Sequence, residues 1–283
     1  MSRGLRRIIV AIVIVVVVVI GIVAYAIAGF AYASSRVAGA NRSLNTVVSH
    51  QNSLNTTFKD MDTKFSGLNS SSTFDPKAAR TLIDQFVANS TSAGTAVDQD
   101  DASLVSAKAS LNEQQWLTYV SKGMLDKEAQ RIDHARKGLS NAKVIAADYV
   151  QDGQFLQAFL DAVVDLDTLG TQSANADLTA AKTTLVTMKT HVDNALKLST
   201  APGLPPELHD LMVDFQALVA DFGKLLDAAA SGDFNSITAA EQAVEKDATK
   251  ISGYNFDKIS TEITAYYQPL VDAFNSEMQK ATA

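Results

Sequence analysis

The stretch ELHDLMVDFQALVADFGKLL, Glu207 to Leu226, decides the fold class of this 283-residue chain. Its large apolar residues recur three or four positions apart, at Leu208, Leu211, Met212, Phe215, Leu218, Phe222, Leu225 and Leu226. This spacing places them on one face of an α-helix, whereas a strand would alternate apolar and polar residues at every second position. No stretch of the sequence shows sustained alternation of that kind. The sequence therefore predicts an all-α protein.

Turn-forming residues on both sides of this stretch predict where the helices begin and end. The loop APGLPPE, Ala201 to Glu207, precedes the helix, and Ser231-Gly232-Asp233 closes it. Asp75 followed by Pro76 predicts the N-cap and the first residue of an earlier helix, which we expect to break near 89–94. Further helices are expected from residue 113 to a turn at 151–153, over 155–169 with a stop at Gly170, and over 178–198, 237–251 and 256–278, the last kinked at Pro269.

The segment from Val37 to Leu68 carries a heptad repeat. Its a positions are Val37, Leu44, Gln51, Phe58 and Phe65, and its d positions are Ala40, Val47, Leu54, Met61 and Leu68. Nine of these ten residues are apolar, and a single polar residue at an a position is a device that fixes register. The repeat predicts either a membrane-proximal stalk that forms a coiled coil or an ordinary long helix of a bundle.

The N-terminal segment from Ile8 to Phe30 contains no charged residue. About 20 apolar residues suffice to cross a hydrocarbon core of about 30 Å, so the segment is long enough to span a membrane. A cleavable signal has a shorter apolar region of about 7 to 15 residues, although Ala31-Tyr32-Ala33 offers a cleavage site for this alternative. We expect a retained transmembrane helix rather than a cleaved signal.

Charge predicts the orientation of this span. Arg3, Arg6 and Arg7 precede it, so residues 1–7 should stay in the cytoplasm and the bulk of the chain should lie outside, at the cell membrane. With 24 basic and 31 acidic residues, the chain is not expected to bind nucleic acid. The predicted organisation is a cytoplasmic N-terminus at 1–7, a transmembrane helix at 8–30, a heptad helix at 31–72, a helical bundle at 73–200 and a second bundle half at 201–283.

The sequence contains no recognisable catalytic or cofactor-binding motif. It has no cysteine, no phosphate-binding glycine loop and no serine nucleophile elbow, and its four histidines lack the spacing of paired metal ligands. We therefore expect a non-enzymatic protein without a cofactor or metal.

Carboxylates line up on one helical face in two places: Glu207, Asp210, Asp214 and Asp221 in one, and Asp161 with Asp165 in the other. Each set is either a cation site or, more simply, the solvated face of its helix. Trp116 and Tyr119 line either a ligand pocket or the core.

Four asparagines stand in the Asn-x-Ser/Thr pattern of glycosylation acceptors: Asn41, Asn55, Asn69 and Asn89. The first three are fourteen residues apart and so share one position of the heptad, although chance in a stretch rich in Asn, Ser and Thr explains them equally well.

The function predicted from the sequence is a membrane-anchored extracytoplasmic helical bundle that serves as a protein-interaction or structural module, with protein partners or self-association. The alternatives are a bundle that carries or senses a small ligand, and a pilin-like filament subunit.

Overall fold

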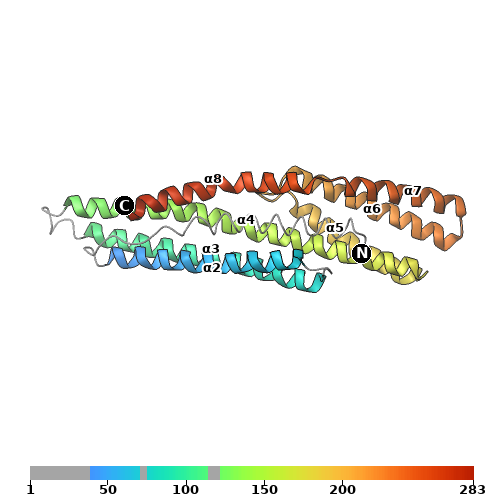
Figure 1. The fold of residues 1–283 in the computed structure, drawn as a ribbon, viewed down its shortest axis with the longest axis horizontal. Coiled ribbons are helices and arrows are strands. Elements are labelled where there is room, and N and C mark those ends of the chain that lie inside the picture. The colour runs from blue at the N-terminus through green and yellow to red at the C-terminus, as the bar shows by residue number, and fades with distance from the viewer. Residues whose placement is uncertain (1–38, 71–74, 114–121) are drawn as a thin grey trace. The chain divides into compact units, whose positions relative to one another are not determined.

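The computed structural model describes residues 39–70, 75–113 and 122–283, and these residues form an all-helical protein. Within these ranges there are seven helices and no strands (Figure 1). Their bounds are α2 (Ala40–Ser70), α3 (Pro76–Glu113), α4 (Lys122–Ala174), α5 (Leu178–Leu198), α6 (Pro206–Ser231), α7 (Phe234–Ser252) and α8 (Phe256–Thr282). The predicted all-α class is therefore confirmed.

The described residues belong to two compact units, each built from segments that are far apart in the sequence. The four-helix unit contains residues 39–64, 86–113, 122–150 and 264–283, which are parts of α2, α3, α4 and α8. The α5–α7 unit contains residues 65–70, 75–85 and 151–263, and therefore holds α5, α6 and α7 entirely. The division of the chain into consecutive parts at 73–200 and 201–283 stays a prediction.

The core of the four-helix unit is a single cluster of apolar side chains from all four of its helices. Its members include Ala40, Leu44 and Val47 of α2, Val97, Leu104 and Leu111 of α3, Ile132 and Leu139 of α4, and Phe274 and Met278 of α8. Of the predicted a and d residues whose side chains are described, Leu54 is half-buried and the rest are buried: Ala40, Leu44, Val47, Met61 and the polar Gln51. Because α2 packs with three other helices of this chain, the bundle-helix interpretation of the heptad repeat accounts for these contacts.

Three predicted interruptions of helices are wrong. Helix α3 runs through 89–94, and α4 runs through both 151–153 and Gly170. An interior glycine costs about 1 kcal/mol of helix stability, whereas burying an aromatic side chain stabilises by about 2 to 3 kcal/mol. Tyr149 and Phe155, on either side of the predicted turn, are both fully buried. Packing of the continuous helix therefore outweighs the local preference for a turn.

The start of α3 and the end of α6 follow the predicted capping residues. The carboxylate of Asp75 accepts hydrogen bonds from the backbone N–H groups of Lys77 and Ala78, at 2.9 and 3.2 Å, and Pro76 is the first residue of α3. Gly232 ends α6 with a φ of 72°, a left-handed conformation that glycine adopts without strain. Asp233 then caps α7 by accepting from the backbone N–H groups of Asn235 and Ser236, so this helix begins at Phe234 rather than at the predicted residue 237.

Helix α8 contains Pro269 in its interior. A proline cannot donate to the carbonyl four residues earlier, and both Pro269 and Ala265 are exposed, so water can bond to that carbonyl. Among the described helices, none combines the length and apolar character that crossing a membrane requires. The predicted span at 8–30 and the predicted cytoplasmic residues 1–7 lie outside the described residues.

Candidate interaction site

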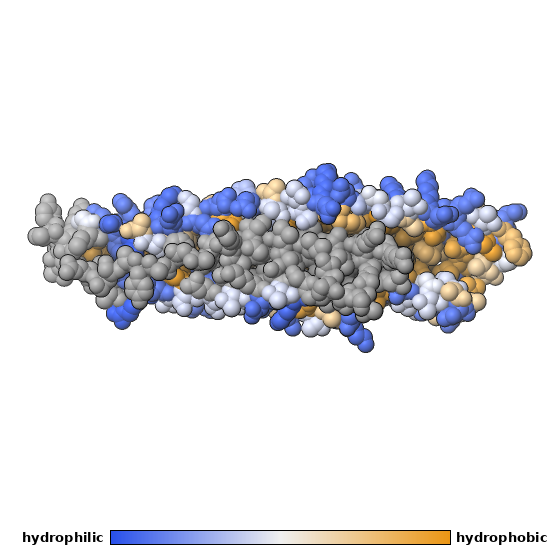
Figure 2. Space-filling model, viewed as in Figure 1, coloured by the Kyte–Doolittle hydropathy of each residue, from blue (hydrophilic) through white to orange (hydrophobic). Residues whose placement is uncertain are grey.

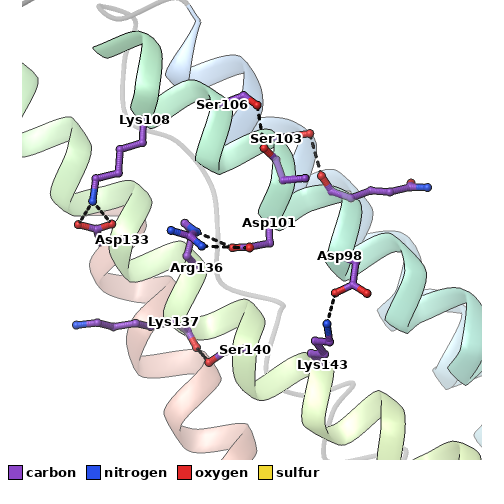
Figure 3. A network of polar contacts seen from close by, with 12 residues as sticks. Asp98, Asp101, Ser103, Ser106, Lys108, Asp133, Arg136, Lys137, Ser140 and Lys143 are labelled. Atoms are coloured by element: carbon purple, nitrogen blue, oxygen red, sulfur yellow. Dashed lines mark hydrogen bonds and ion pairs between the residues drawn. The ribbon is translucent and has the colours of Figure 1, made fainter. Parts of the chain in front are cut away.

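Polar side chains form a row of ion pairs between α3 and α4 in the four-helix unit (Figure 3). Arg136 donates from Nε to Oδ1 of Asp101 at 2.6 Å and from Nη2 to Oδ2 at 3.2 Å. Lys143 contacts Asp98 at 2.6 Å, and Lys108 donates to both carboxylate oxygens of Asp133. Along the row, α3 supplies Asp98, Asp101 and then the basic Lys108. The facing residues of α4 are Lys143, Arg136 and then the acidic Asp133. This charge pattern favours one antiparallel register of the two helices.

Arg131 joins three helices of the same unit. Its Nε donates to the backbone carbonyl of Ala281 at 2.8 Å, and its Nη1 donates to Glu128 at 2.9 Å and to Oδ1 of Asn41 at 3.5 Å. The Arg131 and Glu128 side chains are only 18% and 8% exposed. A buried carboxylate and a buried guanidinium each need such partners, because an unpaired buried charge is strongly destabilising.

Each of the four histidines bonds to a side chain outside its own helix. For three of them the partner lies on another helix, and for His209 it is Ser199, the C-cap residue of α5. His50 contacts Asp100 at 2.7 Å, His134 contacts Glu277 at 2.6 Å, His191 contacts Asp165 at 2.7 Å, and His209 contacts Ser199 at 3.0 Å. Hydrogen bonds from His134 and then from Lys280 lower the pKa of Glu277 to about 2, whereas burial raises the pKa of Asp165. No group of three potential metal ligands gathers among the described residues.

The two carboxylate sets do not form a cation site, because most of their members bond to side chains of the protein. Glu207 pairs with Lys258, Asp221 with Lys224, and Asp161 with Arg80. The interpretation as a solvated face is also wrong for Asp214, which is buried. Its oxygens accept from Lys250 Nζ at 2.6 Å and from the Tyr254 hydroxyl at 2.7 Å. Burial, together with this hydrogen bond, raises the pKa of Tyr254.

The acceptor asparagines lie on two neighbouring helices, α2 and α3. Asn41 is half-buried and accepts from Arg131, and half-buried Asn89 donates from Nδ2 to the sulfur of Met61 at 3.0 Å. Asn55 and Asn69 belong to α2, but their side chains are outside the described residues, as are Trp116 and Tyr119. Glycosylation of these asparagines stays a prediction.

The surface feature that sequence reasoning missed is an open apolar face on the α5–α7 unit. We define this open apolar face by the residues Leu185 of α5, Phe222 and Leu225 of α6, and Phe234, Ile237 and Val244 of α7. The first three and Ile237 and Val244 are only half-buried, and Phe234 is 82% exposed. Figure 2 shows hydrophobic residues gathered in the region of α6 and α7. The three- and four-residue spacing of Phe234, Ile237, Ala240 and Val244 was the signal that could have revealed it.

The comparisons with known proteins supply no relative from which a function could be carried over. No protein-family model matches the chain, and neither a curated protein nor a solved structure is significantly similar to it.

Proposed function

We propose that this chain is a membrane-anchored protein whose helical bundle acts outside the cytoplasm as a protein-interaction or structural module. The observation that carries the proposal is that three histidines form hydrogen bonds to carboxylates on neighbouring helices. In an enzyme such groups would face a substrate, but here His50, His134 and His191 each bond to a carboxylate on another helix. These pairs hold helices together, as a structural module requires.

The anchoring part of the proposal rests on the sequence. The apolar segment 8–30 is long enough to cross a bilayer, and the three arginines before it favour retention of residues 1–7 in the cytoplasm. The bulk of the chain would then lie outside, where Asn41, Asn55, Asn69 and Asn89 would be available to a glycosylating export pathway. A single-pass membrane protein with an exposed bundle follows from this arrangement.

The non-enzymatic part of the proposal rests on the polar clusters. Asp214, the most deeply buried member of the carboxylate sets, bonds to Lys250 and Tyr254, and both partners come from the end of α7 and the turn after it. The cluster therefore closes the α6–α7 hairpin. We assign no catalytic, cofactor or metal role to it.

The proposal is tested with the full chain, tagged at its C-terminus, in its native cells. We expect the tagged chain in the membrane fraction after carbonate extraction, and we expect protease added to intact cells to remove the tag. Mild crosslinking on intact cells should then attach the same protein partner, or a second copy, in repeated preparations. A soluble species that begins near Ser34 would contradict the anchor, and a crosslinked chain that remains monomeric and partner-free would contradict the interaction role.

A further inference from the structure

Helix α7 leaves much of its apolar face uncovered. Only Ala240 and Ile251 of its residues are buried, although Ile237 and Val244 lie on the same helical face three and four positions from Ala240. Phe234, the first residue of the helix, is 82% exposed. An isolated exposed apolar residue is unremarkable, but a row along one helix indicates a surface that a partner covers.

The neighbouring helices extend this uncovered face. Lys250 of α7 contacts Asp214 of α6, so in an antiparallel pair Val244, six residues before Lys250, lies level with Ala220, six residues after Asp214. In the same register the half-buried Phe222 and Leu225 lie level with Gln242 and Ala239, and so between the levels of Val244 and Ile237. Leu185 of α5 lies beside this part of α6, because its Cδ2 is 3.6 Å from the position a Cβ on Gly223 would take. The open apolar face therefore spans three helices.

Charge around this face indicates the chemistry of its partner. Residues 151–263 contain 17 acidic and 7 basic residues, whereas the rest of the chain contains 14 acidic and 17 basic residues. The segment that carries the open apolar face is thus strongly acidic, and the remainder is slightly basic. Glu241 and Glu245, both exposed, follow Ile237 at four and eight positions and so border the face along α7. A cationic partner fits this border.

We infer that the open apolar face binds a basic amphipathic helix of a partner protein, an inference that rests on the proposed interaction function. The partner's apolar residues would cover Phe234, Ile237 and Phe222, while its lysines or arginines would approach Glu241 and Glu245. A second copy using the same face would bring two acidic surfaces together, which costs free energy. An anionic membrane surface is repelled for the same reason.

The test uses the full chain in nanodiscs of zwitterionic lipid, with empty nanodiscs as the blank. The probe is a fluorescent synthetic peptide of about five helical turns, with leucines on one face and lysines on the other. One control peptide carries glutamate in place of every lysine, and a second has the same composition in an order that forms no apolar face. We expect saturable binding of the basic amphipathic peptide alone, weakening as the salt concentration rises from about 0.05 to about 0.5 M.

Paired variants locate the binding. Phe234→Ser should weaken binding about tenfold, as loss of an aromatic anchor does, while leaving the melting temperature unchanged because the side chain is exposed. Val186→Ser is the matched control, since Val186 is 70% exposed on α5 but is not part of the open apolar face. It should leave the affinity unchanged. Equal loss in both variants, or no binding of the basic peptide above the blank, would overturn the inference.

A second pair of variants tests the charge of the border. Glu241→Lys combined with Glu245→Lys should weaken binding about tenfold and reduce its salt dependence. Asp60→Lys combined with Asp272→Lys changes the net charge equally but alters exposed residues of the four-helix unit, and should have little effect. Equal binding of the glutamate peptide would overturn the charge argument. Dimers in sedimentation that Phe234→Ser dissociates would instead assign the face to a second copy.

The outcomes separate this inference from the proposed function. A crosslinked partner that persists with Phe234→Ser, together with no binding of the basic peptide, contradicts the inference alone. A chain that binds the peptide in nanodiscs but is neither anchored nor crosslinked in its native cells contradicts the proposed function alone.

Discussion

Arg136 of α4 and Asp101 of α3 form a two-armed ion pair, with N···O distances of 2.6 and 3.2 Å. Their side chains are 37% and 38% exposed, so the pair lies at the edge of the helix interface rather than in the core. Parallel hydrogen bonds from a planar guanidinium add orientation to the attraction. The pair is therefore the best defined member of the row between the two helices.

Replacing Arg136 by lysine should destabilise the fold by about 0.5 to 1 kcal/mol, because a half-exposed pair contributes modestly and lysine cannot form both arms. Denaturant unfolding monitored by circular dichroism measures the change. Lys143→Ala is the comparison, since its pair with Asp98 is more exposed and single-armed, and it should cost less. A larger loss for Lys143→Ala would contradict this order.

Glu277 makes the four-helix unit sensitive to acid. Hydrogen bonds from His134 and Lys280 lower its folded pKa to about 2 from an ordinary value of 4.5. The stabilisation is thus present above about pH 4.5 and is lost as the pH falls towards 2. The free energy of unfolding should fall less steeply over this window in Glu277→Gln than in the unmodified chain. Parallel slopes in the two proteins would show that Glu277 does not contribute.

Asp214 should be the most sensitive carboxylate of the α6–α7 hairpin. Because it is buried, Asp214→Asn weakens both of its charge-assisted hydrogen bonds and should cost about 1 to 3 kcal/mol. Asp210→Asn, one turn earlier on the same helix but exposed, should change stability by less than about 0.5 kcal/mol. Thermal unfolding of the two variants distinguishes a buried clamp from a solvated acidic face, which would give equal effects.

Two glycines should respond in opposite directions to alanine. Gly232 has a φ of 72°, so Gly232→Ala should destabilise by about 1 kcal/mol. Gly170 lies within α4, and a Cβ there would meet nothing within 4 Å, so Gly170→Ala should stabilise by about 0.5 to 1 kcal/mol. Melting temperatures of the two variants give the signs. If Gly170→Ala were destabilising instead, that result would favour the predicted helix end at Gly170 over a continuous α4.

Signals that act within a few residues determined the helical class and several helix ends. Asp75 with Pro76, and Gly232, act on backbone groups at most four residues away, so the sequence alone identified the start of α3 and the end of α6. The heptad repeat of α2 likewise predicted that Leu44 and Val47 are buried. Such patterns are readable because the period of a helix is set by its own backbone.

Tertiary packing decided what lies between those ends. The turn expected at 151–153 does not form, and the continuous helix α4 buries both Tyr149 and Phe155. Asp101 and Arg136 are 35 residues apart, and their pairing depends on the register of two helices rather than on either sequence pattern. Asp214 reads as a member of an acidic stripe, yet α7 and its following turn bury it. Which apolar side chains of α7 are buried depends on which other helices pack against it, so only the tertiary structure revealed the open apolar face.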